Sequence, residues 1–593
     1  MSRRIEDYAL LADGRGAALT SRNGTIEWLC WPRFDSEPCF AAMLGTAENG
    51  HWRMAPAEPA HSISRRYEAD TLVLQTDFEC RGGGVRLTDF MAVHTQGPFI
   101  VRMVEGLHGS VAMRSVLYPR ADADAPLPVI LPEHGAVTVR TASGAMTLRA
   151  DVPFAVHRHA LEASFALREC KRAVFTPCGE QPGVDTAAAA LALQDTRRHW
   201  RRWIGGFDNS RTHWPQAVRR SLLTLKALIY RPSGAMVAAP TTSLPEAPGG
   251  SLNRDYRYCW LRDASFALEA IIEAGFHGEA MAWRDWLLDT FGEILDTFHI
   301  MYCVDGGHVP RERSVPALTG WRGAQPVRIG NAAATQYQPD VFGEALDGLY
   351  LARKAGIPPV EGEAALEARI VRWLLDHRNR PGSGIWESRS TPCHFTISRV
   401  MAWVARDRFI SHWRDAGPGR GDALVQQAIA LRRALHDEVR THGWHAGRGV
   451  FVRGYADTEL DASVLLMPLV GFMRADDPRM SATLDAIRAE LGDGGLIRRW
   501  KRGGEAPNEG AFLACSCWTA DCLYLGDDED AACRQFERVL AVANDVGLLA
   551  EEYDLQERRL AGNFPQSLTH MAVVKTALLL SGTAKRHRSA AAH

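Results

Sequence analysis

The sequence predicts an N-terminal antiparallel β-sandwich followed by an (α/α)6 toroid of twelve helices. Two observations indicate this fold class. Up to about residue 190, short β-branched or aromatic runs alternate with turn residues, and from about residue 213 apolar residues recur at helical spacing. The length of 593 residues also exceeds what one hydrophobic core usually serves, so two or more domains are expected.

The first region, residues 1–190, contains many strand candidates and no convincing helix. Runs such as DTLVLQTDFECRGGGVRLTDFMAV place short apolar segments between turn residues. Such a succession of short strands is typical of a β-sandwich. The segment DTAAAALALQDTRRHWRRWI then changes to a helical pattern, and we expect residues 191–212 to form a helical linker.

The second region, residues 213–585, contains twelve helix candidates, and residues 586–593 are expected to form a disordered tail. The candidate over 263–274 is the clearest, because Asp263 can cap its N-terminus and Gly275 ends it. The twelve candidates cover residues 213–231, 263–274, 277–299, 336–355, 362–377, 396–414, 421–442, 459–474, 479–491, 510–526, 527–546 and 565–583.

Long and short connections alternate between these candidates. The long connections follow every odd-numbered helix, and the short ones join the helices into six antiparallel hairpins. Six hairpins with all their long connections at one end describe a closed toroid. An irregular helical domain or a solenoid is the alternative, although the sequence shows no repeat of fixed period.

The long connections also hold clusters of charged and aromatic residues. Taken alone, a Trp-Arg-Asp cluster is ordinarily a structural ion pair, and a Glu-Glu pair is ordinarily an exposed surface. Their shared position in the alternating pattern favours a site instead, because loops on a rigid scaffold are where sites are built. The candidate site residues are Trp260, Arg262, Asp263, Trp321, Trp386, Glu387, Arg499, Glu551 and Glu552.

Composition excludes several other functions. The formal net charge of −2 gives no broad field for nucleic acid or an anionic membrane, and no apolar run is long enough to span a bilayer. The N-terminus has no apolar signal region, and the 12 cysteines form no C-x-x-C pair, so we expect a cytoplasmic protein with reduced thiols. No metal or cofactor is expected, and self-association into a homo-oligomer stays open.

The residue types found in the long connections fit one class of reaction. The sequence lacks the G-x-x-x-x-G-K-[ST], G-x-S-x-G and H-E-x-x-H motifs of other enzyme classes. Carboxylates, arginines and tryptophans remain. Glycoside hydrolysis needs a protonated acid for the leaving oxygen, a second carboxylate, and flat groups that hold sugar rings.

With these segments in view, the chain resembles glycoside hydrolase family 15, the glucoamylase and trehalase family, over essentially its whole length. YCWLRDASFALEAI resembles the segment whose Arg and Asp hold the terminal glucose, here Arg262 and Asp263. IWESRSTPCHFTISRVMAW resembles the segment of the general acid, which places the acid at Glu387 and a serine where fungal members have a second Glu. LIRRWKRGGEAPNEGAFLACSCW supplies a substrate-contacting arginine, best matched by Arg499.

The opening segment IEDYALLADGRGAALTSRNGTIEWLCWPRF resembles the N-terminal domain of bacterial family members, and AEEYD resembles the motif of the general base. The resemblance places the base at Glu551, with Glu552 as the fallback. Glu344 also invites assignment as the acid, but it lies within a predicted helix and is expected to be structural.

The resemblance implies an inverting, exo-acting α-glucoside hydrolase, with α,α-trehalose as the preferred substrate. A glucoamylase-like or isomaltose-type α-glucosidase of the same family is the first alternative. An inverting disaccharide phosphorylase is the second, although it needs no base at Glu551. A non-catalytic glucan-binding protein is the third.

Overall fold

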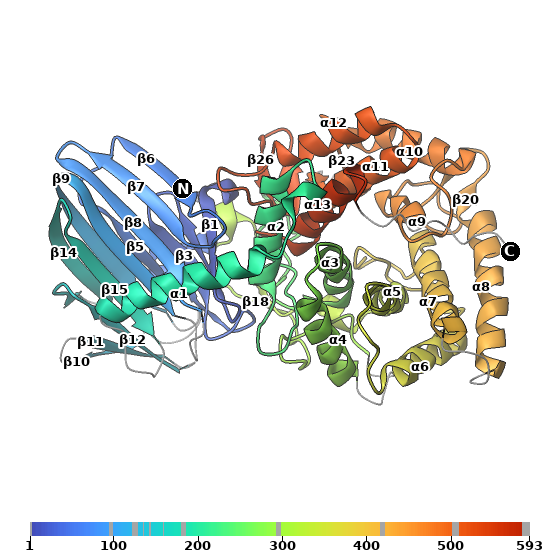
Figure 1. Ribbon diagram of the computed structural model, residues 1–593, viewed down its shortest axis with the longest axis horizontal. Helices are drawn as coiled ribbons and strands as arrows, with labels where there is room; N and C mark the ends of the chain where they lie inside the picture. The colour runs from blue at the N-terminus through green and yellow to red at the C-terminus, as the bar shows by residue number, and fades with distance from the viewer. Residues whose placement is uncertain are drawn as a thin grey trace.

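The computed structural model describes residues 3–93, 99–120, 128–133, 136–141, 144–157, 159–178, 186–291, 298–415, 422–500 and 509–583. Its two parts, an antiparallel β domain and a helical domain, lie side by side and are joined by helix α1 (Thr186–Ile204) (Figure 1). The predicted order of a β region before a helical region is confirmed. The predicted tail, 586–593, lies outside the described residues.

The β domain contains fifteen strands among the described residues, and every strand pair in it is antiparallel. They are β1 (Tyr8–Ala12), β2 (Ala17–Ser21), β3 (Thr25–Cys30), β4 (Pro38–Phe40), β5 (His51–Pro56), β6 (Ser62–Tyr67), β7 (Leu74–Cys80), β8 (Gly83–Met91), β9 (Ile100–Tyr118), β10 (Val129–Glu133), β11 (Ala136–Thr141), β12 (Gly144–Ala150), β13 (Ala155–His157), β14 (Ala160–Arg168) and β15 (Arg172–Cys178).

Strand β9 is shared by two sets of strands. Its first half pairs with β8 and β15, and its second half pairs with β5 and β14. The rings of Trp52 and Phe175, one from each set, meet edge to face with centroids 6.4 Å apart. Fully buried Arg102 bonds Asp89 at 2.9 Å and donates to the Trp52 carbonyl at 2.7 Å. Apolar packing and a paired buried charge therefore hold the two sets together.

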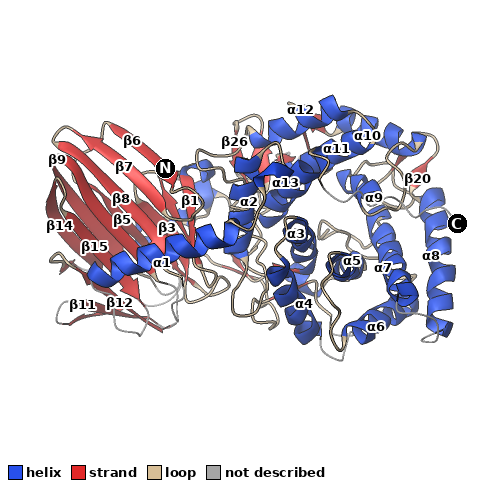
Figure 2. Cartoon of the chain, viewed as in Figure 1, coloured by secondary structure: helices blue, strands red, loops and turns tan. Residues whose placement is uncertain are grey.

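The helical domain contains the helices α2–α13, coloured blue in Figure 2. They are α2 (Pro215–Leu228), α3 (Leu261–Glu273), α4 (His277–Phe291), α5 (Asp340–Lys354), α6 (Glu363–Asp376), α7 (Thr396–Asp415), α8 (Asp422–His442), α9 (Leu466–Leu469), α10 (Pro478–Glu490), α11 (Leu513–Leu525), α12 (Glu529–Leu540) and α13 (Ser567–Leu580). The predicted helical second half is thus confirmed.

Proline and capping residues account for several differences at the helix boundaries. Helix α5 begins at Asp340, directly after Pro339, because proline disfavours helical geometry in the residue before it. Helix α13 begins at Ser567, where the side chain of Gln566 accepts the N–H of Thr569 and caps the helix. The candidate over 459–474 becomes a short 3-10 turn followed by α9, which contains Pro468. The candidate over 277–299 extends into residues that the structure does not describe.

The helices follow a regular order of contact. Helices α3, α5, α7, α9, α11 and α13 each contact the next in the series, and α13 contacts α3. Helices α2, α4, α6, α8 and α12 pack on the outer side of these six (Figure 1). Helices α5 and α7 approach closely at Gly343, where an added Cβ would lie 2.1 Å from the carbonyl oxygen of Met401.

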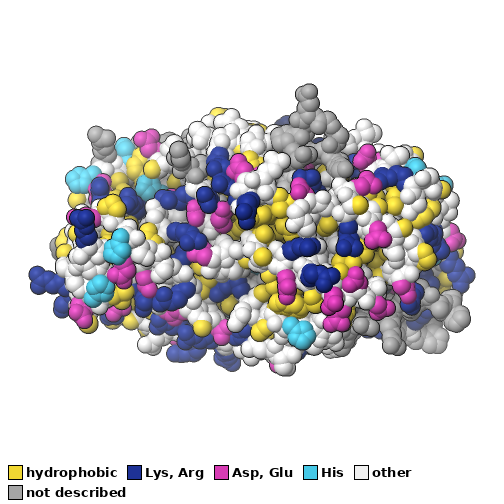
Figure 3. Space-filling view, turned by 90° about the horizontal axis from the view of Figure 1, so that it is seen from above, with side chains coloured by type: hydrophobic (Ala, Val, Ile, Leu, Met, Phe, Trp, Pro, Cys, Tyr) yellow, Lys and Arg dark blue, Asp and Glu magenta, His cyan; other side chains and the backbone are white. Residues whose placement is uncertain are grey.

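The surface of the molecule carries both signs of charge. Acidic and basic side chains are interspersed over the face drawn in Figure 3, in line with the net charge of −2. Within the described part of the chain, every helix is too short or too polar to cross a membrane.

The two domains meet at the connection between α2 and α3. Buried Trp28 of β3 donates its ring N–H to the carbonyl oxygen of Pro240 at 2.7 Å. Arg257 donates to the carbonyl oxygen of Ser36 at 2.6 Å and forms a fully buried ion pair with Asp255 at 2.7 Å. The β domain therefore braces the connection that leads into α3.

Candidate active site

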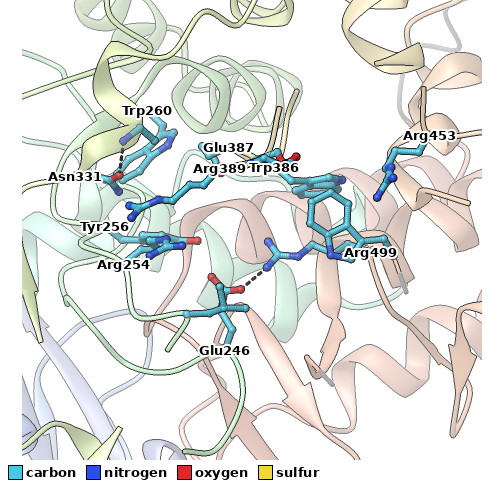
Figure 4. A pocket seen from close by; sticks show the side chains of 15 residues that line it. Glu246, Arg254, Tyr256, Trp260, Asn331, Trp386, Glu387, Arg389, Arg453 and Arg499 are labelled. Atoms are coloured by element: carbon cyan, nitrogen blue, oxygen red, sulfur yellow. Dashed lines mark hydrogen bonds and ion pairs between the residues drawn. The ribbon is translucent and has the colours of Figure 1, made fainter. Parts of the chain in front are cut away.

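A cavity of about 420 Å³ lies where the long connections of the helical domain meet. The connections after α2, α4, α6, α8 and α10 all contribute to its wall. This is the convergence that the alternating connection lengths predict. The wall consists of Glu246, Leu252, Arg254, Tyr256, Trp260, Asn331, Ala333, Trp386, Glu387, Ser388, Arg389, Ser390, Arg453, Arg499 and Trp500 (Figure 4).

Arg262 links the start of α3 to the third connection. Its guanidinium bonds Asp263 at 2.8 Å and Glu387 at 2.6 Å, and it also donates to the carbonyl oxygen of Ile385. Asp263 is buried, and its second oxygen has no hydrogen-bond partner among the described residues. An unsatisfied carboxylate oxygen beside a paired arginine can accept a hydrogen bond from a sugar hydroxyl.

Glu387 occupies a strained turn at the cavity. Its φ is +48°, a left-handed value that is uncommon for a residue with a Cβ, and its N–H donates to the carbonyl oxygen of Gly384 at 3.2 Å. Gln336 fixes the same turn by donating to the carbonyl oxygen of Ser388 at 3.1 Å. Burial and the nearby charge of Asp263 raise the pKa of Glu387, although Arg262 opposes this rise. The shift of the Glu387 pKa is in the direction that a general acid requires.

Glu551 comes from the sixth connection, between α12 and α13. It is 2% exposed, and one carboxylate oxygen accepts a hydrogen bond of 2.8 Å from the hydroxyl of Tyr256, which lines the cavity. The other oxygen has no hydrogen-bond partner in the described part of the chain. Burial and the charge of Glu246 raise the pKa of Glu551, whereas Arg499 and the Tyr256 hydroxyl favour its ionised form.

Glu552 faces a different set of partners from its neighbour. It lies in β25 (Glu552–Asp554), which pairs with β24 (Ala511–Phe512), and it accepts the Gly510 N–H at 2.8 Å. Arg499 binds Glu509 at 2.6 Å, contacts Glu246 directly and lies 3.9 Å from Glu552. Carboxylate oxygens of these three glutamates come within 4.8 Å of one another. The guanidinium of Arg499 thus already supplies a cation to this buried cluster.

Tryptophans form part of the cavity wall. The Trp386 ring N–H donates to Asp461 at 2.9 Å, and its ring packs on Trp518 with centroids 6.1 Å apart. The Trp260 ring packs against Tyr256 at 5.2 Å. Both rings are held by neighbours before any ligand binds, which suits a rigid platform for a sugar.

Of the nine predicted site residues, four line the cavity: Trp260, Trp386, Glu387 and Arg499. Arg262, Asp263, Glu551 and Glu552 are buried and are connected to the lining residues through hydrogen bonds and ion pairs.

Trp321 lies elsewhere. Trp321 is buried and donates its ring N–H to the carbonyl oxygen of Arg3 at 2.9 Å, so it packs between the domains. Glu344 is 1% exposed within α5, as expected for a structural residue. Its burial and the nearby charge of Asp340 raise its pKa well above the usual range.

Sequence reasoning missed several residues of the wall. Tyr256 and Glu246 form their contacts with Glu551 and Arg499 across separations of 295 and 253 residues. A local sequence pattern cannot predict a site residue that is recognised only by its contact with a residue far away in the sequence. The signal that was available is weaker: Tyr256 and Arg254 lie in DYRYCWLRD or directly before it, next to predicted site residues.

The comparisons with known proteins agree with this architecture. A solved structure described as a bacterial glucoamylase complexed with acarbose superposes with a TM-score of 0.75, covering 100% of this chain and 97% of that one at 12% identity. This likeness shows a shared fold.

Sequence comparison identifies the family. Residues 214–578 match the model for glycosyl hydrolases family 15, and residues 1–173 match that for a trehalase-like N-terminal domain. The chain belongs to glycosyl hydrolases family 15. A trehalase of Mycolicibacterium smegmatis is 33% identical over 96% of this chain and 90% of its own length. A trehalase of Thermoplasma volcanium is 30% identical over 97% of this chain and 93% of its own.

Proposed function

We propose that this glycoside hydrolase cleaves α,α-trehalose with inversion, with Glu387 as the general acid and Glu551 as the general base. The main supporting observation is that the carboxyl of Glu387 lines the cavity, while the carboxyl of Glu551, from another connection, is buried against the lining residue Tyr256. Glu387 is anchored by Arg262, and Glu551 is anchored by Tyr256 of the cavity wall. The relatives named trehalase, which match nearly the whole chain, support trehalose as the substrate.

In this mechanism a water molecule attacks the anomeric carbon while Glu551 takes its proton. The bond between that carbon and the glycosidic oxygen breaks, and Glu387 gives its proton to the departing oxygen. Arg262 and Asp263 hold the hydroxyls of the glucose that is attacked. Further substrate contacts come from Trp260, Trp386, Arg499 and Glu552.

The same proposal extends to architecture and location. We infer a β-sandwich over 1–190, a linker over 191–212 and a closed (α/α)6 toroid over 213–585, supported by the circuit of contacts from α3 to α13 and back. We also infer action in the cytoplasm. Eleven of the twelve cysteines, those whose side chains the structure describes, are free, which suits a reducing compartment.

The test compares glucose release from trehalose, maltose, isomaltose, kojibiose and soluble starch at equal concentration. We expect trehalose to give the highest kcat/KM. Proton NMR of the first products should show equal α- and β-glucose from trehalose, and β-glucose from α-glucosyl fluoride. Release of α-glucose from the fluoride would overturn inversion. Turnover that requires phosphate and yields glucose 1-phosphate would instead identify a phosphorylase.

A further inference from the structure

A glutamate behind the cavity wall joins several of the connections that form this wall. Glu312 lies in the connection after α4, directly before β18 (Arg313–Ser314), which pairs with β19 (Arg328–Ile329). Its carboxylate accepts two hydrogen bonds, of 3.1 and 2.5 Å, from Arg389 in the connection after α6. It also lies 3.3 Å from the guanidinium of Arg328. Arg389 lines the cavity, and Glu312 holds it from behind.

Arg328 carries this network to the connection after α2. Its guanidinium donates to the carbonyl oxygen of Asn253 at 2.5 Å. The next residue, Arg254, lines the cavity on the same side as Arg389 (Figure 4). Glu312 therefore holds the wall at two places, since it binds Arg389 directly and reaches the segment of Arg254 through β19.

The carboxylate of Glu312 is suited to a permanent bridge. Burial alone would raise its pKa, but the hydrogen bonds from Arg389 and from the Ala332 N–H, the latter at 3.1 Å, lower it below the usual range. Because the pKa values of Glu387 and Glu551 are raised, Glu312 stays ionised where they titrate. Contact through both carboxylate oxygens also fixes the plane of a guanidinium, which a point charge would not do.

The position of Arg389 determines which part of a substrate it can contact. Arg262, which is proposed to hold the glucose that is attacked, has a side chain that is 10% exposed. The side chain of Arg389 is 36% exposed, so it lies nearer to the open end of the cavity. Glu387 must face the oxygen that departs, and Arg389 is the second residue after it. The leaving half of the substrate therefore comes to lie beside Arg389.

The charges at this wall suit a neutral ligand. Glu246 belongs to the cluster of buried glutamates around Arg499. A guanidinium whose charge is already met by carboxylates can still donate to sugar hydroxyls, because it carries several N–H groups. The wall thus offers hydrogen-bond donors to the leaving sugar. The charged neighbours of Arg254 are Arg389, Arg328, Glu246 and Glu312.

We propose that Glu312 is a positioning residue for the leaving sugar: it holds Arg389 and the segment of Arg254 in the geometry that binds the hydroxyls of this sugar. The inference rests on the proposed function, since it takes Glu387 as the acid. Because Glu312 lies behind the wall, it would touch neither the glucose that is attacked nor the departing oxygen. Its removal should therefore affect only substrates whose leaving group is a sugar.

The test compares kcat/KM for trehalose with that for α-glucosyl fluoride, whose leaving group makes no sugar contact. Glu312→Gln keeps the size of the side chain and removes its charge. We expect about a 10- to 100-fold loss on trehalose, the size of a hydrogen bond to a charged group, and a change within about twofold on the fluoride. Maltose takes the place of trehalose if it is the better substrate. Retained hydrolysis of the fluoride also verifies that the variant folds with its acid and base in place.

Glu68→Gln is the matched control. Glu68 also bridges two arginines, Arg197 at 2.5 Å and Arg201 at 3.7 Å, and its side chain is 10% exposed, compared with 16% for Glu312. Glu68 lies in the β domain, so the ratio of the two kcat/KM values should stay at the wild-type level in this variant.

Arg389→Gln supplies the second arm. If Glu312 acts through Arg389, the double variant should lose less on trehalose than the product of the two single losses. Single losses that simply multiply would overturn the inference, as would unchanged kinetics on both substrates. An equal loss on trehalose and on the fluoride would also overturn it, because Glu312 would then merely support the turn of Glu387. In each of these cases the wild type still hydrolyses its substrates and the proposed function stands. A wild-type protein that cleaves neither substrate would refute the proposed function, and this inference with it.

Discussion

At the scale of single residues, Arg262 connects the proposed acid Glu387 to Asp263, which is proposed to bind the sugar. The same guanidinium contacts Glu387 at 2.6 Å and Asp263 at 2.8 Å. An arginine in direct contact ordinarily favours an ionised carboxylate, yet burial has the larger effect on Glu387 and raises its pKa. The charge of Asp263 contributes to the raised pKa of Glu387. A sugar that hydrogen-bonds to Asp263 would therefore also change the pKa of the proposed acid.

Replacing Glu387 by Gln keeps the shape of the side chain and removes the transferable proton. Activity on trehalose should fall on the order of 100- to 10,000-fold, the usual contribution of general acid catalysis. α-Glucosyl fluoride, whose leaving group needs little protonation, should be partly spared. The measurement is kcat/KM for both substrates, with circular dichroism to verify folding. An equal loss on both substrates would assign the proton to another residue.

Replacing Tyr256 by Phe removes the hydrogen bond that favours ionised Glu551. The pKa of Glu551 should rise further, so a larger fraction of the base is protonated at any given acidic pH. The acidic limb of the kcat/KM profile should move to higher pH by about 0.5 to 1 pH unit, the effect of one hydrogen bond. The alkaline limb, which follows deprotonation of Glu387, should stay in place. An acidic limb that does not move would contradict Glu551 as the base.

At the scale of elements, the close crossing of α5 and α7 depends on Gly343. An added Cβ would lie 2.1 Å from the carbonyl oxygen of Met401, which cannot move without its helix. Gly343→Ala should lower the free energy of unfolding by about 1–3 kcal/mol. Gly278 of α4 has no atom within 4 Å of an added Cβ. Gly278→Ala should therefore be neutral or stabilising by up to about 1 kcal/mol. Urea unfolding of both variants measures the contrast, and equal effects would refute the steric explanation.

The helices could be predicted from the sequence because apolar periodicity is a local property. The ends of the helices could be predicted less precisely. In the candidate over 510–526, for example, Ala511 and Phe512 form strand β24, and the helix begins only at Leu513. Arg262, Asp263 and Glu387 could be predicted as candidates because each follows a tryptophan within three residues, in a segment that resembles one of the family. Tyr256 and Glu246 could not be predicted, because only the folded chain brings them to Glu551 and Arg499 in other connections. The sequence could not give Trp321 its position either, since its partner Arg3 belongs to the other domain.

At the scale of the whole molecule, the β domain supports the active-site connection through Trp28. Trp28→Phe removes the N–H that bonds the buried Pro240 carbonyl, which should cost about 1–3 kcal/mol of unfolding free energy. The kcat/KM for trehalose should also fall, because Pro240 belongs to the connection that carries Tyr256.

Trp200→Phe provides the matched control. Trp200 is 1% exposed, but its ring N–H has no hydrogen-bond partner in the described part of the chain. Both substitutions remove the same atoms, so the difference between them in urea unfolding and in kcat/KM isolates the contact between the domains. Equal losses in the two variants would show that this contact contributes nothing to the site.

The order of the six connections along the chain also determines when activity can arise during synthesis. Glu387 leaves the ribosome well before Glu551, and α13, which follows Glu551, packs against both α2 and α3 at the start of the helical domain. A nascent chain that ends before Glu551 would carry Arg262, Asp263 and the proposed acid Glu387, but neither the proposed base nor the helix that completes the circuit. Under the proposed roles, hydrolysis can begin only after both Glu551 and α13 have been synthesised.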